Sequence, residues 1–137
     1  MHPSVIAFLA RSLSVDDVRG KSVLEVGAFN VNGSPREVIE PLGPASYVGV
    51  DIQAGPGVDM VLDGAHLTEL SGEEAFDLVV STEMLEHAED WRGVVASMKA
   101  VLRDGGLLVL TVRGPGFPRH EFPGDFQDCE KTLSHVY

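Results

Sequence analysis

The chain has 137 residues, and its 10 Lys and Arg against 21 Asp and Glu give a formal charge of −11. This length and a hydrophobic content of 44% predict one globular domain with one core, residues 1–137. The negative charge argues against nonspecific binding to nucleic acid or to an anionic membrane, because both attract cationic surfaces. No apolar run approaches the ~20 residues of a membrane helix, and the single cysteine, Cys129, cannot form an internal disulfide, so we expect a cytoplasmic protein.

Apolar segments of two kinds alternate along the chain. Residues 3–13 have apolar side chains at helical spacing and predict an amphipathic helix. Short apolar runs predict buried strands at residues 21–27, 47–51, 58–62, 76–81 and 106–112. These runs are continuous rather than alternating, which is typical of a parallel sheet covered on both faces.

Two further helices are predicted from their capping residues. Ser34 followed by Pro35 indicates a helix start, and that helix should run over residues 35–40. Asp90 can cap a second helix, and Gly105 is placed to end it in a left-handed turn. Its apolar stripe consists of Trp91, Val94, Val95, Met98, Val101 and Leu102. Strands alternating with helices predict an α/β fold, a Rossmann-like, doubly wound and mostly parallel sheet of about five strands.

Residues suited to ligand binding follow the predicted strands. Gly27 ends the first strand, Asp51 ends the second, Asp63 follows the third and residues 81–87 follow the fourth. The carboxyl ends of parallel strands form the ligand crevice of such sheets, and glycine lets a ligand approach the backbone. A carboxylate about 20 residues beyond the glycine turn can accept both ribose hydroxyls. Taken alone, Gly27 is equally consistent with an ordinary connection between a strand and a helix, and a lone Asp at a strand end is more typical of a turn or a helix cap.

An ordered set of motifs makes the pattern more specific. The segments VLEVGAFNVNGS, YVGVDI, MVLDG, FDLVVSTEMLEH and LRDGGLLVLTV resemble, in order and spacing, the motifs of class I S-adenosylmethionine-dependent methyltransferases of the type 11 kind. The resemblance covers about residues 21–112. It implies S-adenosyl-L-methionine as cofactor, S-adenosyl-L-homocysteine as product, and in-line methyl transfer to an unidentified acceptor, most simply a small molecule.

The resemblance also implies roles for individual residues. Glu25 and the backbone at Gly27 would approach the methionine part of the cofactor, Asp51 would bind the ribose hydroxyls, and Asp63 would accept from the adenine amino group. The other residues expected to line the cofactor cleft are Ala28, Phe29, Asn30, Ile52, Gly64, Ser81, Thr82, Glu83 and His87. This chain departs from the family's glycine pattern, because Phe29 stands at the position of the second glycine.

The residues after the last predicted strand differ from the core at 21–112. Residues 113–137 are rich in Gly, Pro and aromatic residues and predict a loop-rich tail that covers the cleft. The segment GFPRHEFPGDF resembles one found after the fifth strand in some relatives, and its His120 is a candidate general base. A histidine that only anchors this loop fits the pattern equally well. No compact spacing of His, Cys, Asp and Glu predicts a metal site.

Two strands usual in the family have no counterpart after Val112, so we expect the chain to lack them and to expose a sheet edge that could support a homo-oligomer. Two other functions remain alternatives. A non-catalytic S-adenosylmethionine-binding or scaffold protein would keep the cleft without an acceptor pocket. An NAD(P)-dependent oxidoreductase fits less well, because G-x-G-x-x-G and Tyr-x-x-x-Lys are both absent.

Overall fold

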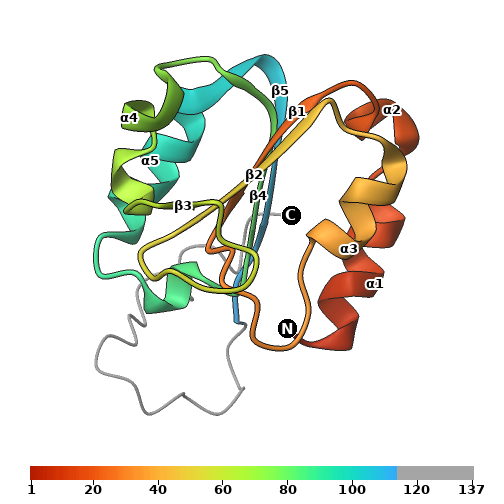
Figure 1. Ribbon diagram of the computed structural model, residues 1–137, viewed down its shortest axis with the longest axis horizontal. Coiled ribbons are helices and arrows are strands. Elements are labelled where there is room, and N and C mark those ends of the chain that lie inside the picture. Colours follow the sequence, from red (N-terminus) through yellow and green to blue (C-terminus); the bar gives the residue numbers. More distant parts are fainter. Residues whose placement is uncertain (114–137) are drawn as a thin grey trace.

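The computed structural model describes residues 1–113, which form a parallel sheet between two layers of helices (Figure 1). The strand order within these residues is β3-β2-β1-β4-β5, and every neighbouring pair is parallel. The strands are β1 (Ser22–Val26), β2 (Ser46–Asp51), β3 (Met60–Val61), β4 (Phe76–Thr82) and β5 (Leu102–Thr111). The predicted doubly wound parallel sheet is therefore confirmed.

The helices cover both faces of the sheet. Figure 1 shows α1 (Pro3–Ser12), α2 (Val15–Val18) and α3 (Arg36–Ile39) on one side, and α4 (Thr68–Ser71) and α5 (Trp91–Val101) on the other. Three short 3-10 helices complete the described part: η1 (Glu40–Leu42), η2 (Gly64–His66) and η3 (Leu85–His87). No helix within residues 1–113 has the length and apolar character needed to cross a bilayer.

Two apolar clusters hold the sheet and the helices together, one on each face of the sheet. There are two because successive side chains of a strand point to opposite faces. Val23 and Leu78 pack with Leu9 of α1 on one face, whereas Leu24 and Val79 belong to the cluster of α5 on the other. All of these side chains except Leu9 lie in central strands, and each is fully buried. The continuous apolar runs of β1 and β4 follow from this two-sided burial.

The predicted cap at Asp90 is confirmed, whereas α3 begins at Arg36, one residue later than predicted, with Pro35 rather than Ser34 at its N-cap position. Ser34 Oγ accepts a hydrogen bond from the backbone N–H of Arg36 at 3.1 Å. Asp90 Oδ1 accepts from the N–H of Gly93 at 3.0 Å, and α5 begins at the next residue after Asp90. These contacts satisfy backbone donors that have no partner inside the helix.

The prediction that Gly105 ends α5 is wrong. The helix ends at Val101, and Leu102 is already extended and pairs with Phe76 of β4. Pairing and burial of Leu102 against the core therefore set the end of the helix. Gly105 does adopt a left-handed conformation, with φ of 74°, but it lies within β5, where the register against β4 shifts between Leu102 and Leu107.

The third strand is shorter and more open than predicted. Residues 58–62 were expected to form a buried strand, but β3 contains only Met60 and Val61, whose side chains are 45% and 55% exposed. The reason is position: β3 is an edge strand, paired on one side with β2 alone. Its apolar residues do not distinguish an edge strand from a central one.

The packing of α5 on the sheet generates a stability prediction. Met98 is fully buried in the cluster that joins α5 to β1 and β4, so Met98→Ala should lower the free energy of unfolding by about 2–5 kcal/mol. Urea denaturation followed by circular dichroism measures this. The neighbouring Lys99 is exposed, so Lys99→Ala is the matched control and should change stability by less than about 0.5 kcal/mol. Equal effects of the two substitutions would contradict this account of the core.

Candidate functional site

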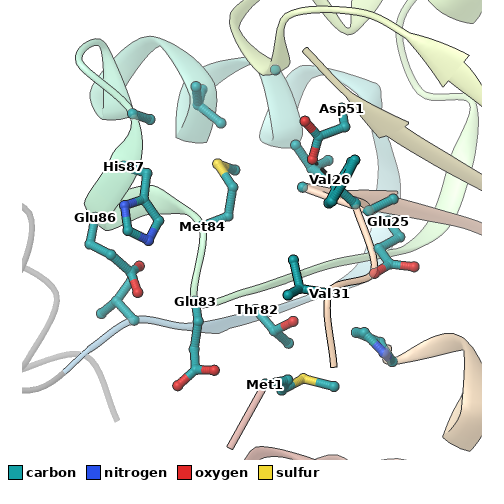
Figure 2. Close-up of a pocket in the computed structure, with 18 of the residues that line it drawn as sticks. Met1, Glu25, Val26, Val31, Asp51, Thr82, Glu83, Met84, Glu86 and His87 are labelled. Carbon is teal, nitrogen blue, oxygen red and sulfur yellow. Dashed lines mark hydrogen bonds between the residues drawn. The ribbon is translucent and has the colours of Figure 1, made fainter. Parts of the chain in front are cut away.

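A cavity of about 1440 Å³ lies at the carboxyl ends of the strands (Figure 2). The loops after β1, β2, β3 and β4 line it, together with residues 112–113 after β5 and residues 1–5 at the start of α1. The chain passes from β1 to β2 on one side, whereas β4 lies on the other side of β1. Open α/β sheets bind ligands at this kind of switch in strand order.

Gly27 shapes the middle of the cavity. Its φ of 83° is left-handed, and its N–H donates to the carbonyl of Val50 at 2.9 Å as the chain leaves β1. A Cβ at this position would overlap the side chain of Met84, which comes from the loop after β4. Both the turn and the contact with Met84 therefore require glycine.

The departure at Phe29 has a local explanation. Its ring packs on the backbone of Gly55, where any Cβ would overlap the ring. The next residue, Asn30, donates its N–H to the carbonyl of Pro56 at 2.8 Å. The bulk of Phe29 is thus accommodated by a second glycine, and it joins the loop after β1 to the loop after β2.

Asp51 is anchored at the end of β2 and still has acceptor capacity. Its Oδ2 accepts from the N–H of Phe29 at 3.1 Å, and its Oδ1 accepts from the N–H of Gln53 at 3.1 Å. A carboxylate oxygen can accept two hydrogen bonds, so each oxygen can take one more. Asp51 can therefore accept from two neighbouring hydroxyls of one ligand.

Glu25 is a buried acid at the floor of the cavity. It is 2% exposed, and its Oε2 accepts from the Tyr47 hydroxyl at 2.7 Å, while the Ser34 hydroxyl lies 3.4 Å from both oxygens. Burial raises the pKa of Glu25 to about 7, although the hydrogen bond from Tyr47 and the charge of Arg36 act in the opposite direction. This carboxyl can therefore gain its charge when a cationic group binds beside it.

Arg36 supports this arrangement from outside the cavity. Its guanidinium lies 4.5 Å from the centroid of the Tyr47 ring and pairs with Asp59. Asp59 also accepts from the N–H of Gly49 at 2.7 Å. The cation–π contact and the ion pair hold Tyr47 in the position from which it reaches Glu25.

Acidic residues also follow β4. Glu83 adopts φ of 50°, which is uncommon for a residue with a side chain, and its N–H donates to the carbonyl of Thr111 at 2.9 Å. Its Oε2 accepts from the N–H of His2 at 3.2 Å. Figure 2 shows Glu83, Glu86 and His87 on one side of the cavity and Glu25 and Asp51 on the other.

Glu86 was not predicted from the sequence. It lines the cavity and is 2% exposed, and its Oε2 is buried without a hydrogen-bond partner among the described residues. Burial raises its pKa to about 7. Its spacing of three residues from Glu83 did not indicate it, because Glu83 lies before η3 with a left-handed backbone and not in the same helical turn.

Most of the predicted site residues meet at this cavity. Those that line it are Glu25, Gly27, Ala28, Phe29, Asp51, Ile52, Asp63, Gly64, Thr82, Glu83 and His87. Asn30 does not line it, since its Oδ1 accepts from the N–H of Gly33 at 2.8 Å and stabilises the turn. Ser81 does not either, because it lies inside β4 and is 1% exposed. His120 and the predicted cleft-covering tail lie outside the described residues.

The charge of the lining favours a cationic ligand. Among residues 1–113, the only Arg or Lys that lines the cavity is Arg113. The acidic residues that line it are Glu25, Asp51, Asp63, Glu83, Glu86, Glu89 and Asp90. No group of three His, Cys, Asp or Glu in this part of the chain is arranged to hold a metal ion. The cavity therefore suits an organic cation with hydroxyl groups.

Known proteins with related sequence or fold are methyltransferases. The family described as "Methyltransferase domain" matches residues 2–130. A phthiotriol/phenolphthiotriol dimycocerosates methyltransferase from Mycobacterium tuberculosis is 34% identical over 107 residues, which cover 70% of this chain and 39% of that protein. The chain spans about two-fifths of the length of the curated relatives it matches.

Solved structures share the fold. The S-adenosylmethionine-dependent methyltransferase from Mesorhizobium loti matches with a TM-score of 0.64 and 22% identity, over 80% of this chain and 52% of that one. A SAM-dependent methyltransferase from Archaeoglobus fulgidus matches with a TM-score of 0.65 and 20% identity, over 82% of this chain and 53% of that one. This chain therefore shares the arrangement of its sheet and flanking helices with these two structures.

The buried position of Glu25 predicts how stability depends on pH. Its pKa is about 7 in the folded chain against 4.5 for an ordinary Glu, so ionisation stabilises the unfolded chain more than the folded one. The free energy of unfolding should fall as pH rises between these two values, by up to about 1.4 kcal/mol per pH unit for this one group. In Glu25→Gln, the free energy of unfolding should fall less steeply with pH, and the part of the pH dependence that comes from Glu86 should remain.

Urea denaturation at a series of pH values measures the effect. Glu73→Gln is the control, because Glu73 is exposed and does not line the cavity. Parallel pH profiles for the wild type and Glu25→Gln would contradict the account of Glu25.

Proposed function

Because the chain belongs to the methyltransferase-domain family, we propose that it is an S-adenosylmethionine-dependent methyltransferase that acts on a small-molecule acceptor by in-line displacement. The observation that carries the proposal is the placement of Asp51 beside the Gly27 turn, with both residues lining one acidic cavity. The chain spans about two-fifths of the length of the curated relatives it matches, so the activity of the whole protein is part of this proposal.

The residues of the cavity fit the parts of the cofactor. The free acceptor positions of Asp51 suit the two ribose hydroxyls, and Ile52, which is 74% exposed, offers an apolar surface beside them for adenine. Asp63 caps η2 by accepting from the N–H of Ala65 at 2.9 Å, and its other oxygen can accept from the adenine amino group. Glu25 can bind the ammonium group of the methionine part.

The cofactor, when bound, supplies a methyl carbon that is already activated by the sulfonium. The residues of this chain then have to align the acceptor, exclude water and accept a proton where the acceptor atom carries one. The name of the mycobacterial relative refers to phthiotriol and phenolphthiotriol dimycocerosates, which supports a small-molecule acceptor here.

Further parts of the proposal concern the whole chain. We propose that residues 1–137 act as one cofactor-binding domain with a core at 21–112 and a cleft-covering tail at 113–137, and that the protein works in the cytoplasm. The edge of the sheet at β5, where Leu107 is 38% exposed, would be the contact in a homo-oligomer. Light scattering of the purified chain tests that last point directly.

Calorimetric titration with S-adenosylhomocysteine tests the cofactor site. Asp51→Ala should weaken binding at least about tenfold, because a hydrogen bond to a charged acceptor contributes roughly 1.5–3 kcal/mol. Asp104→Ala is the matched control, since Asp104 is exposed and does not line the cavity, and it should bind like the wild type.

Absence of binding by a folded wild-type chain would overturn the proposal. Binding without turnover of S-adenosylmethionine, across a panel of hydroxyl, amine and thiol acceptors, would instead support the non-catalytic alternative.

A further inference from the structure

Glu86 is placed for chemistry that the cofactor site does not explain. Its side chain is 2% exposed, and Oε2 is buried without a partner among the described residues although it belongs to a cavity-lining group. A buried acceptor without a hydrogen-bond partner is costly, and a ligand that donates a hydrogen bond to the group removes that cost. In the close-up, the Glu86 carboxyl lies beside the His87 ring on the side of the cavity away from Asp51 (Figure 2).

The strand order separates two regions of the cavity. Asp51 ends β2, and the loop that carries Glu86 follows β4, with β1 between these strands. Neighbouring strands are about 4.8 Å apart, so the two loops start about 10 Å from each other. A ligand whose ribose binds Asp51 and whose ammonium binds Glu25 extends from the end of β2 to β1, and the region beside β4 and β5 remains for a second ligand.

We propose that Glu86 is a catalytic residue whose carboxylate accepts a proton from the methyl acceptor, so that the acceptor group is a hydroxyl or an amine. This inference rests on the proposed methyltransferase function and extends it to the substrate class.

The step balances in atoms and electrons. A lone pair of the acceptor oxygen or nitrogen forms the bond to the methyl carbon, and the bond between that carbon and sulfur breaks with its electron pair remaining on sulfur. The proton of the acceptor atom passes to the Glu86 carboxylate and converts it to the neutral acid. No further reactant is needed.

The surroundings of Glu86 set the pH at which it can accept a proton. Burial and the nearby charge of Glu83 raise its pKa, whereas Arg113 and backbone N–H groups of Glu86 and Arg113 lower it, with a result of about 7. His87 is the remaining titratable neighbour in η3. Glu86 is therefore partly ionised near neutral pH, which suits a general base.

Sinefungin tests the assignment without knowledge of the acceptor. This analogue carries an amino-substituted carbon where the cofactor has its methylated sulfur, so its ammonium group should reach toward Glu86, whereas S-adenosylhomocysteine has no group there. Calorimetry with EDTA present, at about pH 8 where Glu86 is ionised, compares the two compounds on the wild type, Glu86→Gln and the exposed control Glu73→Gln.

The wild type and Glu73→Gln should prefer sinefungin by about tenfold or more, as expected for a charge-assisted hydrogen bond. Glu86→Gln should lose this preference and keep its affinity for S-adenosylhomocysteine. In the wild type, the preference should also decrease as the pH is lowered through about 7, and this measurement needs no variant.

The outcomes separate the two proposals. Retention of the preference in Glu86→Gln, or a pH-independent preference in the wild type, would overturn the role of Glu86 while the cofactor site stands. Failure of the wild type to bind either compound would overturn the proposed function itself, and the role of Glu86 with it.

Discussion

The contact between Gly27 and Met84 is the constraint on which the cavity depends. Gly27 ends the central strand β1, and Met84 lies in the loop after β4, so the contact joins the two halves of the cavity across the switch in strand order. A side chain at residue 27 would have to displace Met84 and would also be strained by the left-handed backbone. The region near Asp51, which we propose for the cofactor, and the region near Glu86, which we propose for the acceptor, both take their positions from this junction.

The loops around the junction are fixed by pairing with one another. The Phe29 ring lies on Gly55, and Asp51 accepts from the N–H of Phe29, so the loops after β1 and β2 form one wall. On the other side, the N–H of Glu83 donates to Thr111 at the end of β5 and fixes the loop after β4. A wall built from backbone hydrogen bonds keeps its carboxylates in place before any ligand arrives, which reduces the ordering that binding requires.

The central strands of the sheet were predicted well from the sequence, because a single pattern, the continuous apolar run, identifies a strand that is buried on both faces. Continuous apolar runs identified the central strands, and a parallel sheet brings the residues after those strands to one edge, so Gly27 and Asp51 were found from position alone. The errors came from tertiary contacts. Leu102 left the helical stripe because it pairs with Phe76. Ser81 follows the same apolar run as Thr82, but the alternation of side chains along β4 buries the first and leaves the second at the cavity.

Glu86 shows why part of the site was out of reach of the sequence. Its neighbour Glu83 carries the same charge three residues earlier, and nothing in the pattern says which of the two is buried. The difference arises in η3, which turns Glu86 inward among apolar residues such as Leu85. Burial then makes Glu25 and Glu86 alike, with a pKa of about 7 for each. Because both can be neutral when the cavity is empty, the fold avoids two uncompensated buried charges, and a cationic ligand restores those charges only where it can pair with them.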